Sequence, residues 1–128
     1  MYVAFALARM VEDQKISVVV SEYCMSACIL IAVASPESYA EKTAVFGFHR
    51  VSPLAEITSE IWQDAVNIQN TEAREFLRGH GVPESILAES DKYGPDMVYE
   101  VPAKFMVDAG AIKGLMLNGE VIAVGPKH

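Results

Sequence analysis

A nearly continuous apolar segment, residues 27–34, follows the sequence CMSAC at residues 24–28 and constrains the fold more than any other feature. Ahead of it, the β-branched run at 16–20 is typical of a short buried strand. Residues 27–34 are compatible with a helix, and because almost every side chain is apolar, we expect that helix to be buried in the core. Ser26 would then lie where a strand leads into a buried helix.

Two roles are open to Ser26 at such a position. Its hydroxyl can accept a hydrogen bond from a free N–H of the first helical turn and so cap the helix. It can also act as a nucleophile, because the same helix end offers N–H groups and positive potential to a developing oxyanion. The rest of the sequence has to decide between these roles.

The composition describes one globular domain spanning residues 1–128, with 52% hydrophobic and 21% charged residues. The net charge of −7 argues against nucleic acid as a partner, because phosphate binding needs clustered lysine and arginine. A transmembrane segment is not expected, since no run approaches the roughly 20 apolar residues that cross a bilayer.

The first ten residues are apolar, but they lack a basic start, are interrupted by Arg9 and lead directly into Glu12 and Asp13. We therefore expect no signal peptide. A complete chain would be cytoplasmic on this basis, whereas loss of an upstream signal would leave an exported or periplasmic protein.

The two cysteines, Cys24 and Cys28, are too few for a disulfide scaffold. Their spacing allows a local disulfide, weak metal binding or simple packing. We favour packing, because a free cysteine behaves as a small buried apolar side chain. No further cysteine or suitably spaced histidine completes a ligand set, so we expect no metal and no cofactor.

Short strands alternate with helices along the chain, and this order predicts an α/β fold. The first helix, an amphipathic one, begins almost at residue 1 and has Val3, Leu7, Met10 and Val11 as its apolar side. Asn118-Gly119 is the strongest two-residue hairpin signal near the end of the chain. The further expected helices are 27–34, 54–78, 84–90 and 102–109, and the expected strands are 16–20, 44–48, 98–101, 115–117 and 120–124.

The helix expected at 54–78 is long for so small a domain. Its apolar stripe repeats at helical spacing, with acidic residues largely opposite. We expect part of this helix to project or to pack against another subunit. The stripe consists of Leu54, Ile57, Ile61, Ala65, Ile68 and Phe76.

His49 is the best candidate for a catalytic base among the three histidines. His128 is terminal, and His80 lies at a glycine-flanked helix end, where we expect a solvated cap. His49 ends the strand at 44–48, and strand ends are where α/β sheets place their working side chains. A nucleophilic Ser26 needs such a base within hydrogen-bond reach. The alternative is that Ser26 only caps and His49 only packs.

These motifs resemble the Clp-protease-like branch of the ClpP/crotonase superfamily. The resemblance is carried by CMSAC at 24–28 ahead of the apolar helix, by GFHRVSP at 47–53 and by the late segment 97–112. It is closest to the small periplasmic-type proteins with a Cys-x-Ser-Ala-Cys signature. It implies a spiral of short strands and helices, and it implies that 54–78 is a handle helix that mediates contacts in a homo-oligomer.

The resemblance further implies a serine-type peptidase acting on a peptide or protein substrate by acyl transfer. Ser26 would be the nucleophile, His49 the base that activates it, and the backbone N–H of Ala27 an oxyanion donor. Asp96 would be the third member of the triad, with Asp91 as the alternative. The sequence carries no feature that identifies an ATPase partner.

One departure from the family concerns the N-terminus. Family members carry a Gly-Gly segment before the helix equivalent to residues 1–14, and it supplies a second oxyanion donor. Here the sequence begins inside that helix, so we expect a fold that lacks the first strand-helix unit. Loss of one such donor costs a factor of about 10²–10³ in rate. A fragment of a longer protein is the favoured explanation, and a second chain that fills the gap is the other.

Two alternative functions share this fold. A catalytically impaired pseudoenzyme or oligomerising assembly module would use the long helix alone. Crotonase-type chemistry on acyl-CoA needs no serine–histidine pair, so the presence of Ser26 and His49 argues against it.

Overall fold

Helices and short strands alternate from end to end, as the sequence predicts. The computed structural model describes residues 2–25, 27–48, 60–93 and 97–127. Within these residues the elements are α1 (Tyr2–Asp13), β1 (Val18–Val20), β2 (Tyr23–Met25), α2 (Ala27–Ala34), β3 (Ser38–Glu41), β4 (Val45–Phe48), α3 (Glu60–Gly79), α4 (Glu84–Ser90), β5 (Tyr99–Pro102), α5 (Ala103–Ala109), β6 (Gly114–Leu117) and β7 (Glu120–Val124).

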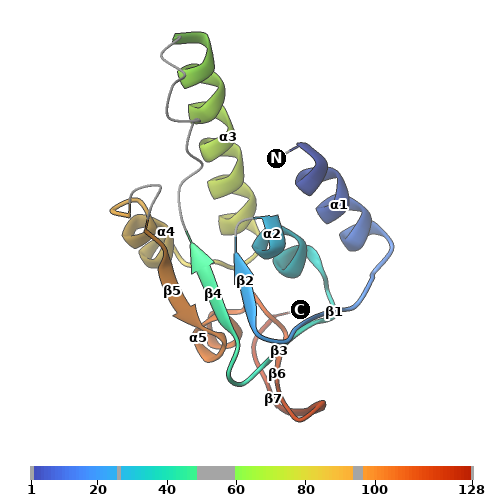
Figure 1. Ribbon diagram of the computed structural model, residues 1–128. Coiled ribbons are helices and arrows are strands. Elements are labelled where there is room, and N and C mark those ends of the chain that lie inside the picture. Colours follow the sequence, from blue (N-terminus) through green and yellow to red (C-terminus); the bar gives the residue numbers. More distant parts are fainter. Residues whose placement is uncertain (1, 26, 49–59, 94–96, 128) are drawn as a thin grey trace.

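The strands form two small mixed sheets. One has the order β1-β3-β6-β7, in which β1, β3 and β6 are parallel and β7 returns antiparallel to β6. The other has the order β2-β4-β5, with β2 and β4 parallel and β5 antiparallel to β4. Consecutive strands therefore alternate between the sheets in the first half of the chain, and α2 connects β2 of one sheet to β3 of the other (Figure 1).

One hydrophobic core joins both sheets to α2, α4 and α5, and a second cluster joins α1 to α2. Helix α2 is almost entirely apolar, and most of its side chains are buried, as its composition predicts. The core therefore fixes the helix that follows Ser26 in the sequence. The core residues include Val20, Ala40 and Leu115 from the first sheet, Phe46 and Val101 from the second, and Ile29, Val33 and Met106 from α2 and α5.

Helix α1 buries a different face from the one that the sequence pattern indicates. Ala4, Ala8 and Val11 are buried, and the two alanines pack with Leu30 of α2. The prediction is correct for Val11 and wrong for the other three residues. Val3 is 73% exposed, Leu7 40% and Met10 42%. Apolar residues lie on most sides of this helix, so the sequence pattern does not single out one face. The alanine face packs against α2 because small side chains let two helix backbones approach closely.

The segment ahead of the CMSAC motif holds two strands instead of one. The run predicted as a strand at 16–20 is β1 at Val18–Val20, and a separate strand, β2, leads into the motif. A further strand, β3, begins at Ser38, where the sequence analysis expects no strand. Parallel pairing of β3 with both β1 and β6 stabilises it there despite its weak local strand signal.

The later elements follow the sequence prediction closely. Helix α4 spans Glu84–Ser90, and α5 ends at Ala109, followed by Gly110 with a φ of 88°. Asn118 and Gly119 turn the β6–β7 hairpin with positive φ angles. The predicted long helix corresponds to α3, and residues 54–59 lie outside the described residues.

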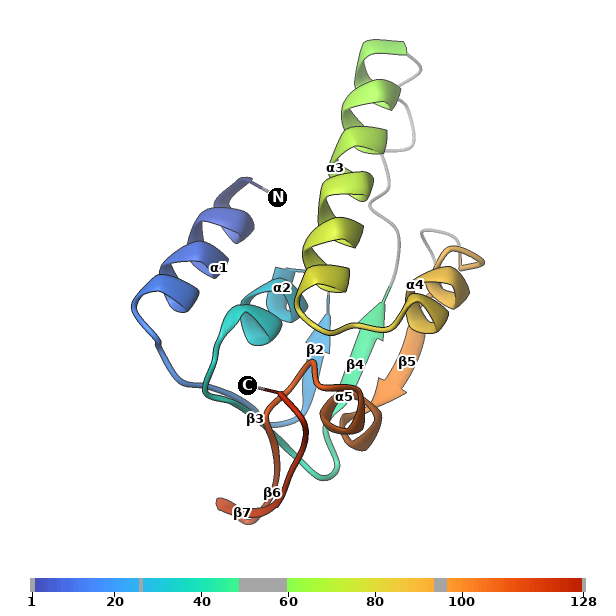
Figure 2. The same cartoon turned by 180° about the vertical axis from the view of Figure 1, so that it is seen from behind.

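Helix α3 extends well beyond the rest of the described chain, with its first turns farthest from the sheets (Figures 1 and 2). None of the helices that the structure describes has both the length and the apolar character needed to cross a membrane.

Candidate active site

Three strand ends meet at one edge of the sheet formed by β2, β4 and β5. Parallel pairing places Met25 opposite Gly47, so β2 and β4 both end at this edge. Antiparallel pairing places Tyr99 opposite Phe48, so β5 begins at the same edge (Figure 1). The strands that end immediately before Ser26 and His49 are therefore neighbours. The strand before Ser26 is β2, whereas the run predicted as a strand at 16–20 is β1 and lies in the other sheet.

The side chains of the predicted triad lie outside the described residues. Ser26 follows the last residue of β2, His49 follows the last residue of β4, and Asp96 shortly precedes β5. Their roles therefore remain predictions. The described structure contributes the sheet edge to which all three connect along the chain.

Ala27, the predicted oxyanion donor, is the first residue of α2. It is half-buried and packs beside α1, while the following turns of the helix enter the core. The first N–H groups of a helix have no partner within the helix, and they carry its positive dipole end. Ala27 thus occupies a position whose backbone N–H suits an oxyanion.

Cys24 and Cys28 form a disulfide, with their Cα atoms 5.3 Å apart. Our preference for separate packing of the two thiols is therefore wrong. The bond links the fully buried Cys24 of β2 to the half-buried Cys28 of α2. Bonded sulfurs are not available as thiolate ligands for a metal.

Gly47 has a packing role that the sequence analysis missed. A Cβ atom at this position would lie 2.5 Å from Tyr23 Oη and 2.7 Å from Val98 Cγ1. The glycine in β4 therefore lets the Tyr23 ring from β2 and the Val98 side chain close over the strand, two residues before His49. A glycine between large residues in a predicted strand is the only sequence signal for such a close approach.

Asp91, the alternative third triad member, caps the C-terminal end of α4 and forms an ion pair with Arg74 of α3. The neighbouring carboxylate of Asp91 raises the pKa of Arg74. Arg74 also contacts Glu84 at 3.3 Å, and Arg78 contacts the same carboxylate at 2.7 Å. The Asp91 carboxylate thus belongs to a network that joins α3 to α4.

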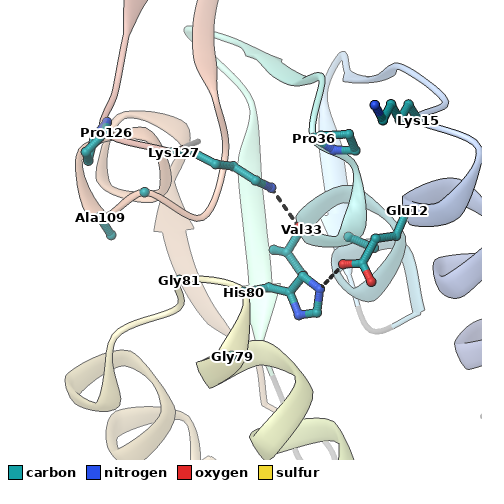
Figure 3. A pocket seen from close by; sticks show the side chains of 12 residues that line it. Glu12, Lys15, Val33, Pro36, Gly79, His80, Gly81, Ala109, Pro126 and Lys127 are labelled. Atoms are coloured by element: carbon teal, nitrogen blue, oxygen red, sulfur yellow. Dashed lines mark hydrogen bonds and ion pairs between the residues drawn. The ribbon is translucent and has the colours of Figure 1, made fainter.

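A separate cavity of about 520 Å³ lies where the C-terminal ends of α2, α3 and α5 come together (Figure 3). His80 lines it and contacts Glu12 of α1 through Nε2 at 2.5 Å and the Phe76 carbonyl through Nδ1 at 2.8 Å. His80 is half-buried, so the expectation of a solvated cap is wrong in that respect. Its ring stacks on Phe76, and its contact with the Phe76 carbonyl agrees with a cap at the end of α3.

Lys127 lies across the same cavity (Figure 3). Its Nζ donates hydrogen bonds to the carbonyl oxygens of Val33 and Ala111 at 2.7 and 2.8 Å, and it lies 3.3 Å from Ser38 Oγ. Burial lowers the pKa of Lys127 to about 8. Because its polar atoms and those of His80 are engaged with protein groups, we interpret this cavity as a junction that holds helix ends together.

No family model matches the sequence, and no curated protein matches it. Among solved structures, a ClpP1 mutant from Listeria monocytogenes matches with a TM-score of 0.65 at 15% sequence identity. The match covers 90% of this chain and 68% of that one. A second structure, of an enzyme, matches with a TM-score of 0.63 at 9% identity, and it covers 85% of this chain and 64% of that one.

The chain has a ClpP-like fold. At these identities the likeness concerns the fold alone, and it confirms the predicted α/β spiral of short strands and helices. Within the ClpP-like fold, the sheet of β2, β4 and β5 is the part that connects to all three predicted triad residues. Assignment to the branch with a Cys-x-Ser-Ala-Cys signature stays a prediction.

Proposed function

We propose that the protein is a serine-type peptidase-like hydrolase that cleaves peptide bonds by acyl transfer, with Ser26 as nucleophile and His49 as base. The observation that carries the proposal is the register at one sheet edge. Met25 and Phe48 end neighbouring parallel strands there, and the chain continues from them directly into Ser26 and His49. The ClpP-like fold supports the same reaction class.

In the proposed reaction, His49 takes the hydroxyl proton of Ser26 as the oxygen attacks the carbonyl carbon of the peptide bond. The negative charge that develops on the carbonyl oxygen accepts a hydrogen bond from the Ala27 N–H at the positive end of α2. His49 then donates the proton to the leaving amine. Water, activated by the same histidine, hydrolyses the acyl-enzyme and restores the serine.

Asp96 is our choice for the residue that orients His49. It shortly precedes β5, and β5 begins opposite Phe48, the residue before His49. The competing Asp91 already forms the ion pair with Arg74 that links α3 to α4. A carboxylate engaged with a guanidinium is a poor partner for an imidazole elsewhere, because leaving Arg74 would cost that charge-assisted contact.

Labelling with a fluorophosphonate probe, which reacts only with an activated serine, tests the proposal. We expect labelling of Ser26 in the oxidised protein, none in Ser26→Ala and a large decrease in His49→Ala. Ser21, an exposed serine between β1 and β2, provides the matched control, and Ser21→Ala should label like wild type. A folded wild-type protein that resists the probe would contradict the catalytic proposal.

A second candidate function, assembly into a homo-oligomer through α3, is favoured by the way this helix extends beyond the described body (Figure 2). Under this second function, copies of the chain would associate through α3 whether or not the protein is catalytically active. Light scattering on the 128-residue chain tests it, and a monomer at all concentrations would contradict it.

A further inference from the structure

The Cys24–Cys28 disulfide closes the chain segment that contains Ser26. One sulfur belongs to β2 and the other to the first turn of α2, and the two cysteines are separated by four positions in the sequence. The disulfide therefore bridges the elements on either side of the proposed nucleophile in the sequence.

The two anchors of this bridge differ in how firmly the fold holds them. Helix α2 is fixed by its buried side chains, among them Ile29 and Leu30 immediately after Cys28. Strand β2 is only three residues long and, among the described strands, pairs with β4 alone. Of its three residues only Cys24, itself part of the disulfide, is buried, so β2 has few other contacts with the core. Beside the backbone, the disulfide is thus a second covalent link between β2 and the start of α2.

We propose that this disulfide is a redox-controlled positioning element for Ser26: the site is competent with the bond closed and loses competence when a dithiol opens it. The inference rests on the proposed function of Ser26. Disulfides persist in oxidising compartments, so the closed form would be the working form there.

The opening reaction is an ordinary thiol–disulfide exchange. A thiolate of the dithiol attacks the Sγ atom of Cys28, the half-buried partner, and displaces the Cys24 thiolate, which takes up a proton. The second thiol of the reductant then attacks the mixed disulfide and releases the Cys28 thiol. Two electrons pass from the dithiol to the protein, and the reductant leaves as a cyclic disulfide.

The test compares rates of fluorophosphonate labelling before and after treatment with dithiothreitol, with thiol titration to confirm that the bond has opened. We expect the rate to fall about 10- to 100-fold on reduction, because small displacements of a reacting group cost that much, and to recover on reoxidation. The double variant Cys24→Ala/Cys28→Ala should label slowly with or without dithiothreitol.

A control variant separates positioning from general stability. Lys127→Met weakens the junction around the cavity lined by His80 and Lys127 and leaves residues 24–28 unchanged, so it should keep a near wild-type labelling rate even where its melting temperature falls. Equal labelling of the oxidised and reduced proteins would overturn the inference, as would loss of the circular dichroism spectrum on reduction. Absence of labelling in the oxidised protein would instead contradict the proposed function.

Discussion

At the scale of single residues, Lys127 shows how a buried amine can be satisfied in both charge states. As an ammonium it donates to Val33, Ala111 and Ser38. As a neutral amine it still has two N–H donors for the two carbonyls and a lone pair for the Ser38 hydroxyl proton. The neutral form loses little inside the protein, which agrees with a pKa lowered to about 8.

The lowered pKa of Lys127 predicts a stability that rises with pH. An unfolded lysine holds its proton up to its ordinary pKa of 10.5, whereas the folded one begins to lose it near 8. Between these values the unfolded chain binds more protons, so raising the pH favours the folded state. Urea titrations from pH 7 to 10 should show this rise for wild type, and the rise should be smaller in Lys127→Met. Parallel pH profiles for the two proteins would contradict the prediction.

Gly47 provides a prediction on packing beside the candidate site. In Gly47→Ala the added Cβ would press on Tyr23 Oη and Val98 Cγ1, and such overpacking typically costs about 1–3 kcal/mol. Tyr23 is half-exposed, so Tyr23→Ala alone should cost little and should relieve part of the strain in the double variant. Thermal unfolding measures the cycle. If the two substitutions add independently, the close approach of Tyr23 is not what requires glycine.

Single residues also show where sequence reasoning stops. The pattern could identify Ser26, Ala27 and the cysteines as important, because polar and sulfur side chains next to a buried apolar run are conspicuous. It could not decide between packing and a disulfide for Cys24 and Cys28. That outcome depends on how β2 and α2 are placed in the fold, with the two Cα atoms 5.3 Å apart.

At the scale of elements, the apolar composition of α2 predicts its burial. Helix α1 has apolar residues on most sides, so its sequence does not show which face is buried. Strands β2 and β3 are short and weakly patterned, and their pairing partners are distant in sequence, so they escape local prediction. The sequence could predict that Ser26 and His49 follow strands. It could not predict the register in which those strands pair.

The face that α1 buries is testable with a matched pair of substitutions. Ala8 is fully buried against α2, so Ala8→Leu should destabilise the protein by about 1–3 kcal/mol through overpacking. The neighbouring Leu7 is 40% exposed, and Leu7→Ala should change stability by only a few tenths of a kcal/mol, about the scale of surface substitutions. Urea denaturation gives both values. The opposite order of the two costs would place Leu7, not Ala8, on the inward face.

At the scale of the whole molecule, α1 and α3 offer two alternative places where copies could meet. One is the stripe of Val3, Leu7 and Met10 that α1 leaves exposed. The other is α3, which extends away from the sheets and carries a sequence stripe that includes Ile61 and Ile68 (Figure 1). A buried unpaired carboxylate is strongly unfavourable in an interface. A glutamate introduced on the helix that forms the interface should therefore dissociate the assembly, and one on the other helix should not.

If α3 forms the interface, Ile61→Glu should lower the molar mass measured by light scattering toward that of one chain, whereas Leu7→Glu should leave the assembly intact. The comparison is informative because both substitutions replace an aliphatic residue with the same charge on a helix. Dissociation of Leu7→Glu alone would move the interface to α1 and would overturn the proposed role of α3. If the α3 interface also supports the active site, fluorophosphonate labelling should fall in Ile61→Glu in step with the measured mass, since dissociation would then remove a contact that the site needs.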